Sequence, residues 1–251
     1  MHESARIYIK SAVMCCPEPE LLASFNMPCL NVDNNLIPAA IRRRTSMTTR
    51  MAITAATKAC QQAGVNTALL PSVFASLGGE IQVTDALCRL LPLAEALLSP
   101  TQFHNSVHNT TAGYWGILNQ CQAASTAIAA VDDTFAMGLL EAYTQLQLAH
   151  GDLLLVCYDE LWPQYLAPPI GQAACACALV LSTDRQQALG SISVPRIKPI
   201  ASPLDEHWSA LVDAVPAVAA LPLLCAINTQ QPAVIPLNPK GNIWFTEFES
   251  C

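Results

Sequence analysis

Short apolar runs alternate with helix-like patterns through the middle of the chain, and this alternation limits the folds that the chain can adopt. Residues 125–131 and 153–156 are apolar runs of strand length, and residues 135–149 between them repeat apolar side chains with a helical period. A further apolar run follows at residues 173–181. Strands that are apolar on both faces and alternate with helices indicate a mixed or parallel sheet covered by helices. The sequence therefore predicts an α/β fold.

The first third of the chain follows the same plan. Alternation of polar and apolar residues predicts a first strand over residues 5–14. Methionine and alanine recur at four-residue spacing over residues 45–63, which predicts a helix that Gly64 ends. An apolar strand is expected at residues 73–77 and a second helix at residues 82–91.

Composition limits the partners of the chain. Of its 251 residues, 52% are apolar and 12% are charged, which supports a large core and a broad buried interface. Basic residues number 12 against 19 acidic ones, whereas nucleic-acid binding requires clustered positive charge. The one basic cluster, Arg42-Arg43-Arg44, is short and is interpreted as a solvated helix start. No nucleic-acid partner is therefore expected.

The length fits one domain, which we predict to span residues 1–251. From about residue 195 the chain is rich in proline and shows fewer α/β units. A helix is still expected near residues 207–215.

Two segments bear on the location of the protein. Residues 1–10 carry several charges and lack the apolar core of a signal peptide, so a cytoplasmic location is expected. The apolar stretch at residues 210–227 contains Asp213, Pro216 and Pro222, a combination that a membrane-spanning helix tolerates poorly. We interpret this stretch as buried helix and loop, or as surface that a partner covers.

Eleven cysteines invite a disulfide interpretation, which their positions do not favour. Several lie inside apolar runs, as in Cys175-Ala176-Cys177 and Leu224-Cys225, where a thiol behaves as a small buried hydrophobic group. The C-x-x-C spacing of zinc sites does not occur. Neither a metal nor another cofactor is expected.

Four segments keep the order and spacing found in one protein family. Their sequences are RRRTSMTTRMAITAATKACQQAG from Arg42, SLGGEIQVTDALCRLL at 76–91, LSPTQFHNSVHNTTAGYWGI at 98–117 and DDTFAMGLLEAYTQLQLAHGDLLLVCYDE at 132–160. Each segment is degenerate, but together they resemble the β-ketoacyl synthase-like N-terminal-domain proteins. That family includes short chain-length-factor partners of ketosynthases from bacterial aryl polyene gene clusters. The resemblance implies an α/β, truncated thiolase-like fold with layered helices and a mixed sheet, mainly the N-terminal half.

The resemblance also implies a cysteine nucleophile at the turn between a buried strand and a helix. There the helix N-terminus stabilises a thiolate and an oxyanion. In this chain the turn follows residues 125–131. The family spacing gives Thr134 when counted back from the next Gly-Asp turn, and it gives Asp132 when counted forward from Asn109. Neither of these residues nor Asp133 between them is cysteine, so the nucleophile position is degenerate.

The residues of this turn are typical of an ordinary helix start and not of a nucleophile site. Asp132 and Asp133 would raise the pKa of a nearby thiol by like-sign repulsion, whereas such carboxylates suit the N-cap of an ordinary helix. The nearest cysteine, Cys121, precedes the strand and is expected at its wrong end. Thr134 is a poor substitute nucleophile because a hydroxyl needs a base to activate it.

A decarboxylating ketosynthase, by the same resemblance, needs two histidines from its C-terminal half to polarise a thioester carbonyl. After His150 the chain has only His207, whose Asp-Glu-His-Trp context matches neither family motif. The nucleophile and both histidines are thus missing together. Condensation by this chain alone is not expected.

His104 and His108 are four residues apart, so on a helix they would share a face and could bind a metal. Pro100 and the Ser-Val-His-Asn pattern place them in a loop that leads into a helix predicted over residues 109–118. Because no third ligand lies nearby in the sequence, structural hydrogen bonding is the favoured interpretation. The resemblance implies that this loop lies near the dimer interface and the acyl tunnel.

Bulky side chains near that region are candidates to line an acyl pocket or a subunit interface. They are Phe103, Tyr114, Trp115 and Phe135, with His104, His108 and Asn109 beside them. For each aromatic residue taken singly, core packing is the better interpretation.

The leading hypothesis is a non-catalytic, chain-length-factor-type subunit. It forms a heterodimer with a full-length β-ketoacyl-ACP synthase, shapes the acyl pocket of that enzyme and meets acyl carrier protein through the complex. Polyene or fatty-acid-like biosynthesis is the implied setting. Two alternatives stay open, namely an independent enzyme on a thiolase-like fold with non-standard residues, and an acyl-carrier-binding scaffold.

Overall fold

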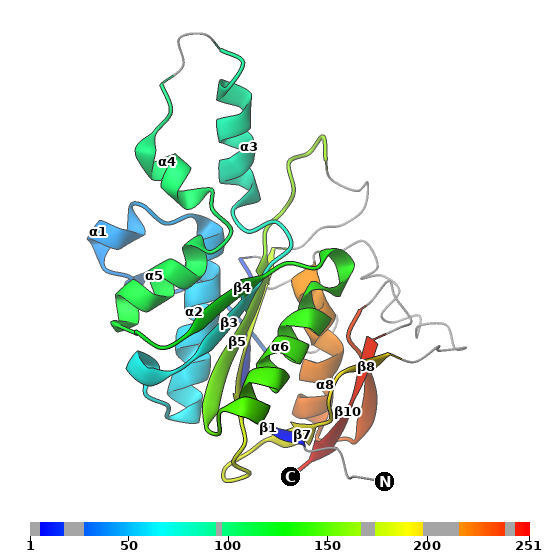
Figure 1. The fold of residues 1–251 in the computed structure, drawn as a ribbon. Coiled ribbons are helices and arrows are strands. Elements are labelled where there is room, and N and C mark those ends of the chain that lie inside the picture. The colour runs from blue at the N-terminus through cyan, green and yellow to red at the C-terminus, as the bar shows by residue number, and fades with distance from the viewer. Residues whose placement is uncertain (1–5, 18–27, 94–96, 167–173, 198–215, 239–243) are drawn as a thin grey trace.

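The computed structural model of the chain describes residues 6–17, 28–93, 97–166, 174–197, 216–238 and 244–251. Ten strands form one mixed sheet (Figure 1). In chain order they are β1 (Ile7–Cys15), β2 (Cys29–Leu30), β3 (Ser72–Ala75), β4 (Ser125–Ile128), β5 (Asp152–Asp159), β6 (Cys175–Ser182), β7 (Gly190–Ile192), β8 (Arg196–Ile197), β9 (Ala233–Pro236) and β10 (Trp244–Ser250). Their order across the sheet is β4-β3-β5-β6-β1-β7-β10-β8, with β2 paired to β1 and β9 to β10.

Helices cover both faces of this sheet (Figure 1). They are α1 (Ala39–Arg42), α2 (Met47–Ala63), α3 (Ile81–Leu90), α4 (Pro100–Asn105), α5 (Thr110–Asn119), α6 (Thr134–Leu148) and α8 (Leu221–Thr229). Short 3₁₀ helices occupy Asn34–Leu36, Thr67–Leu69, Val131–Asp133 and Pro216–Ala220. On one face α2 packs against β1, β5 and β6, and on the other α6 packs against β3 and β5.

The alternation of side chains along β5 divides the apolar core into two layers. Leu153, Leu155 and Cys157 pack in the layer that contains α6 and α8. Leu154 and Val156 pack in the layer that contains α2. The prediction of strands that are apolar on both faces, under a cover of helices, is confirmed for this central strand.

The helix predicted over residues 45–63 is confirmed as α2, and local chemistry explains its ends. The Ser46 hydroxyl accepts a hydrogen bond from the Thr49 backbone N–H at 2.9 Å, which satisfies one of the N–H groups left open at the helix start. Gly64 ends the helix with a φ of 65°, a left-handed conformation in which glycine carries no steric penalty.

Two expectations need correction. The strand predicted over residues 125–131 ends at Ile128 and lies at the edge of the sheet, where it is only partly buried. The triplet Arg42-Arg43-Arg44 begins with the last residue of α1 and does not start a helix, because Ser46 provides the next N-cap. The helix expected near residues 207–215 lies outside the described residues.

The apolar stretch at residues 210–227 and the cysteines lie largely in the interior of the described structure. The described part of the stretch at 210–227 is buried as a 3₁₀ helix followed by α8. Six of the eleven cysteines are buried as free thiols, among them Cys175 and Cys177, which confirms hydrophobic packing for these six, whereas Cys225 is partly buried and Cys88 and Cys251 are exposed. Within the described ranges, no helix combines the length and apolar character needed to cross a membrane.

Gly138 allows α6 to pack closely on the sheet. A Cβ atom at this position would lie 2.8 Å from the Ala75 Cβ and 3.3 Å from the Leu155 Cδ1. Gly113 in α5 offers the opposite environment, because a Cβ there would meet no heavy atom within 4 Å. The contact at Gly138 therefore fixes the distance between α6 and the strands β3 and β5.

We predict that Gly138→Ala lowers the free energy of unfolding by about 1–3 kcal/mol, since the added methyl group must displace β3 or α6. Gly113→Ala is the matched control and should be neutral or stabilising by up to about 1 kcal/mol, because alanine favours a helix. Urea denaturation followed by circular dichroism measures both. Equal stability of the two variants would contradict the packing argument.

Candidate functional site

Three loops meet at one edge of the sheet because β3, β4 and β5 run parallel and end there. The loop after β4 leads into α6, the loop after β3 leads into α3, and the third follows β5. Ligands of open parallel sheets bind outside the carboxyl ends of the strands. This edge is therefore the candidate functional site.

The corner between β4 and α6, residues 129–133, is a sharp turn with no thiol. Val131 has a φ of 51°, a left-handed conformation that costs energy for a β-branched residue. Its side chain is 65% exposed. Strained turns between a strand and a helix are a recurrent way of presenting a nucleophile, but here the strained position carries an aliphatic side chain.

Thr134 is fully buried at the start of α6 and holds the corner together. Its hydroxyl donates to the Val131 carbonyl at 2.6 Å and accepts from the Ala130 N–H at 3.1 Å. Both hydrogen-bonding roles of this oxygen are thus used by backbone groups of the corner. A hydroxyl in this position is a structural group, not a presented nucleophile.

The predicted capping of α6 by an aspartate side chain is wrong. Asp133 occupies the N-cap position, but its carboxylate makes no capping hydrogen bond. Instead it accepts a hydrogen bond from the Asn238 side chain. A 3₁₀ turn over Val131–Asp133 precedes the helix, and the Asp133 carboxylate is engaged by Asn238 and not by the N–H groups at the start of α6.

Cys121 lies at the opposite end of β4, as the sequence predicts. Its thiol donates to the carbonyl of Leu70, which precedes β3, at 3.5 Å. Because β3 and β4 are parallel, residues before them lie at the edge opposite the corner. This thiol therefore does not belong to the candidate site.

The loop after β3 is held by a carboxylate from β5. Asp159 accepts hydrogen bonds from the Ser76 hydroxyl at 3.0 Å and from the Leu77 N–H at 2.8 Å. Its second oxygen accepts from the Ala217 N–H at 3.1 Å. One buried side chain thus joins β5, the loop after β3 and the 3₁₀ helix at Pro216–Ala220.

Two further acids hold the start of α3. Glu160 accepts from the Gln82 N–H at 2.9 Å and from the Thr48 hydroxyl, so a residue of another loop supplies the missing cap of α3. Glu80 is buried and accepts from the Ser46 hydroxyl at 2.7 Å and from the Thr49 hydroxyl. Its other oxygen has no hydrogen-bond partner among the described residues.

Burial dominates the ionisation of these three acids. Desolvation raises the pKa of Asp159 to about 7, and the hydrogen bonds from Leu77, Ser76 and Ala217 only partly offset it. Desolvation also raises the pKa of Glu80 and of Glu160, against the opposing effect of their hydroxyl and backbone donors. These acids were missed by sequence reasoning, although acidic residues directly after the buried run at 153–156 were an available signal.

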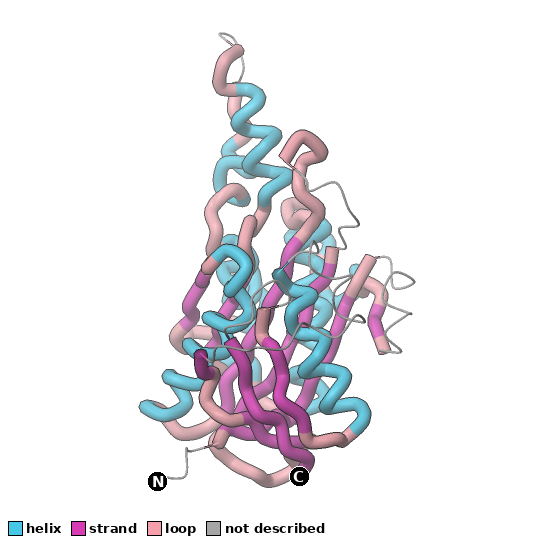
Figure 2. The backbone as a smooth tube through the Cα atoms, turned by 90° about the vertical axis from the view of Figure 1, so that its right-hand side faces the viewer, coloured by secondary structure: helices cyan, strands magenta, loops and turns pink. Residues whose placement is uncertain are grey.

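The arm, which we define as α3 and α4 with residues 91–93, 97–99 and 106–107, projects from the body of the molecule (Figures 1 and 2). Six of its large apolar side chains are exposed. They are Leu91, Leu93, Leu97, Leu98, Phe103 and Val107. Apolar surface gathered in this way marks an interaction site.

The loop after β5 adds apolar surface beside the arm. Leu161, Tyr165 and Leu166 are exposed there. The Tyr165 hydroxyl donates to the Asp85 carboxylate of α3 at 2.5 Å, and the Arg89 guanidinium lies 5.0 Å from the Tyr165 ring centre. This loop is therefore fastened to the arm.

Three of the four aromatic candidates lie inside the protein. Phe135 and Trp115 are fully buried, and Tyr114 is 6% exposed. Phe135 belongs to the core layer of α6, and Trp115 belongs to the layer of α2. The core-packing interpretation is correct for these three residues. Phe103 differs, because it is 64% exposed on α4.

The polar candidates occupy separate places. The loop prediction is wrong for His104, which lies in α4 with its ring 6.1 Å from the Tyr114 ring, edge to face. His108 lies in the turn before α5, as predicted, and its Nε2 forms a 2.8 Å hydrogen bond with the Ser76 carbonyl. Asn109 is exposed at the N-cap of α5 and makes no side-chain capping bond. Only His108 contacts the loop held by Asp159.

Comparison with known proteins identifies the fold family. The family model described as "Beta-ketoacyl synthase, N-terminal domain" matches residues 19–231 of the chain. A search of curated proteins finds no match.

Solved structures share the fold at low sequence identity. A chain of a ketosynthase in complex with its chain length factor (ApeO with ApeC) from Xenorhabdus doucetiae has a TM-score of 0.70 and 20% identity, covering 97% of this chain and 99% of that chain. The ishigamide ketosynthase/chain length factor has a TM-score of 0.71 and 10% identity, covering 98% and 99%. A β-ketoacyl synthase from Burkholderia phymatum STM815 has a TM-score of 0.63 and 12% identity, covering 88% and 70%. The predicted α/β, thiolase-like fold class is thereby confirmed.

Asp159 makes the stability of the folded protein decrease as the pH rises. Its pKa is raised from 3.8 to about 7 by burial, so the folded protein holds this proton more tightly than the unfolded chain does. The resulting stabilisation is complete below pH 4 and is lost as the pH rises through 7. We predict that the free energy of unfolding falls over this range by up to about 1.4 kcal/mol per pH unit for this one proton, and that Asp159→Asn removes that slope.

Urea denaturation at pH 5, 6, 7 and 8 measures the effect. The matched control is Asp184→Asn, because Asp184 is an exposed aspartate outside the site. Its slope should equal that of the wild type. A variant at Asp159 that keeps the wild-type slope would show that this carboxyl does not titrate as proposed.

Proposed function

The chain belongs to the β-ketoacyl synthase N-terminal-domain family, and from this premise we propose that it is a non-catalytic, chain-length-factor-type subunit. In this role it forms a heterodimer with a full-length β-ketoacyl-ACP synthase and helps to shape the acyl pocket of that enzyme. The complex, not the chain alone, receives acyl carrier protein. We assign the pair to polyene or fatty-acid-like biosynthesis.

The observation that carries the proposal is the corner after β4. A condensing enzyme of this family presents a cysteine at the turn that leads into the helix, and this chain has no cysteine there. The strained residue is Val131, and Thr134 behind it is fully buried with both hydrogen-bonding roles of its hydroxyl occupied. No side chain of the corner can accept an acyl group as a thiolate does.

The edge strand β4 supports the assignment of a protein partner. It pairs with β3 on one side, and on its other side no strand of the described chain covers it. An uncovered edge offers N–H and C=O groups to a strand of another chain. The corner follows β4 directly, so a partner at this edge would lie beside Val131.

The exposed arm supports the same assignment. Six large apolar side chains of the arm face solvent in the isolated chain, and burying them against a partner would be favourable at about 25 cal/mol per Å² of apolar surface. Ketosynthase complexes with a chain length factor are among the proteins that share this fold. The proposal assigns the same kind of pairing to this chain.

Phe103 is the aromatic candidate that we assign to the partner's acyl pocket. It stands on α4 with 64% of its surface exposed, whereas Tyr114, Trp115 and Phe135 are enclosed by their own chain. A side chain on the arm can enter a neighbouring subunit without unfolding its own core. Its bulk would then limit the length of the acyl chain.

We predict that co-expression with the cognate synthase gives a 1:1 complex on a sizing column. The double substitution Leu91→Asp and Phe103→Asp should weaken this complex at least about tenfold, because two charges would have to be buried without a partner. The dissociation constants of the wild-type and variant complexes are measured by titrating labelled synthase with each form of this chain.

The matched control is Leu69→Asp, because Leu69 is equally exposed at 74% but precedes β3, at the opposite edge of the sheet. This variant should bind the synthase as the wild type does. If the wild-type chain and the synthase elute as separate species, the heterodimer proposal is contradicted. Equal weakening by both variants would remove the arm from the interface.

We also predict that Thr134→Ala leaves acyl product formation by the complex within a few-fold of wild type, because this hydroxyl is structural. Loss of the hydrogen bonds to the Val131 carbonyl and the Ala130 N–H should reduce the free energy of unfolding by about 1 kcal/mol, and Thr134→Ser should retain most of the stability. Product analysis of the purified complex and thermal denaturation measure the two effects. If the Thr134→Ala variant assembles correctly but forms no product, the corner after β4 takes part in catalysis and the non-catalytic proposal is contradicted.

A further inference from the structure

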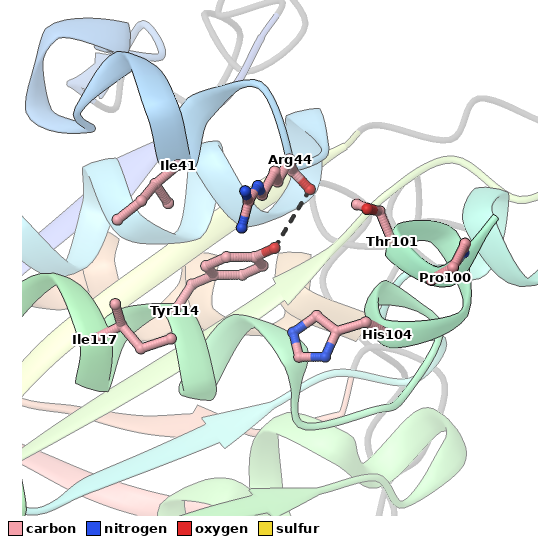
Figure 3. A pocket seen from close by; sticks show the side chains of 7 residues that line it. All are labelled: Ile41, Arg44, Pro100, Thr101, His104, Tyr114 and Ile117. Carbon is pink, nitrogen blue, oxygen red and sulfur yellow. Dashed lines mark hydrogen bonds between the residues drawn. The ribbon is translucent and has the colours of Figure 1, made fainter.

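A pocket separate from the sheet edge opens between α1, α4 and α5 (Figure 3). Its volume is about 370 Å³, which lies within the range of small-molecule sites. Figure 3 shows the Arg44 side chain above the Tyr114 ring, with His104 beside this ring and Ile117 on the far side. Two of its lining residues, His104 and Tyr114, are among the acyl-pocket or interface candidates that the resemblance implies, but the proposed function does not use this pocket.

Hydrogen bonds in the floor of the pocket fix the position of Arg44. The Tyr114 hydroxyl donates to the Asn105 side-chain oxygen at 3.0 Å, and the Asn105 amide group donates to the Arg44 carbonyl. Asn105 and Tyr114 are both buried. These hydrogen bonds connect the Arg44 backbone to α4 and α5. The Arg44 side chain therefore extends from a backbone position that is held in place at the pocket wall.

The charge of Arg44 is not neutralised locally. Within the described residues, no aspartate or glutamate forms an ion pair with it. Arg44 is the charged residue among those that line the pocket, in a chain whose net charge is −7. A guanidinium presents paired N–H donors that match the two oxygens of a carboxylate.

The rest of the wall is amphipathic. Ile41, Ile117 and the Tyr114 ring give an apolar side, and Ile117 is 62% exposed in the absence of a ligand. Thr101 adds a hydroxyl on the side of the Arg44 carbonyl, whereas the Arg44 guanidinium lies above the Tyr114 ring toward Ile41 (Figure 3). An anion with an apolar body satisfies both sides, whereas a fully polar anion would leave the isoleucines in contact with water.

We propose that this pocket binds a small carboxylic acid with an aliphatic or aryl body, its carboxylate on Arg44 and its apolar part against Ile41 and Ile117. The inference goes beyond the proposed function and does not depend on it. Binding of such an acid would be an additional property of the subunit, outside the acyl pocket of its partner.

Titration of the full-length chain with sodium hexanoate, followed by calorimetry or by NMR shifts, tests the proposal. Saturable 1:1 binding is expected, and acetate should bind more weakly by about threefold for each methylene that the pocket buries. Hexanamide, which has the same shape without the charge, should bind at least about tenfold more weakly than hexanoate.

Arg44→Gln should reduce hexanoate affinity about tenfold to a hundredfold, because it removes the charge-assisted hydrogen bonds. The matched control is Arg43→Gln, since Arg43 is exposed next to the pocket but does not line it. Its affinity should stay within about twofold of wild type, as expected for a screened charge outside the site. Unchanged melting temperatures show that both variants are folded.

Three results would overturn the proposal. Hexanoate that fails to saturate the wild-type chain would show that no site exists. Equal binding of hexanamide would show that the carboxylate is not recognised. Equal losses in Arg43→Gln and Arg44→Gln would show that the attraction comes from the surface charge and not from the pocket.

Discussion

The parallel pairing of β3 with β4 and β5 is the constraint on which the rest of the structure depends. Parallel strands end at the same edge, so the corner, the start of the arm and the acids after β5 are brought together although they are far apart in the sequence. The α6 helix must return across these strands, and Gly138 permits the close approach to Ala75 that this return requires. A slip of β4 against β3 would separate the corner from the arm.

Buried acids connect the loops at this edge of the sheet. Asp159 and Glu160 bind backbone N–H groups of the loop after β3 and of α3, which attaches the arm to the sheet. Burying three carboxyl groups costs stability, as the raised pKa values of Glu80, Asp159 and Glu160 indicate. The hydrogen bonds that these acids accept hold the start of the arm against the sheet, and six apolar side chains of the arm are exposed.

Periodicity predicted α2, α3, α5 and α6 and the strands β1, β3, β5 and β6, because each depends on side chains close in sequence, whereas the short elements α1, α4 and β2 were not predicted. Gly64 marked the end of α2 correctly for the same reason. The corner was harder to predict, since no residue type signals a positive φ at Val131, and the sequence assigned a capping role to Asp133, whose carboxylate contacts Asn238 instead. The role of Asp159 was not predictable, because its donors Ser76 and Ala217 are 83 and 58 residues away.

The arm and the carboxylate pocket share one short helix. In α4, Thr101 and His104 line the pocket while Phe103 between them faces solvent. Because α4 has only six residues, an acid bound at Arg44 would contact the same turn that presents Phe103. If the bound acid changes the affinity of this chain for a synthase, the synthase must change the affinity for the acid by the same factor. The two proposals are therefore separable by mutation but linked in energy, and the size of that linkage is set by how far α4 moves.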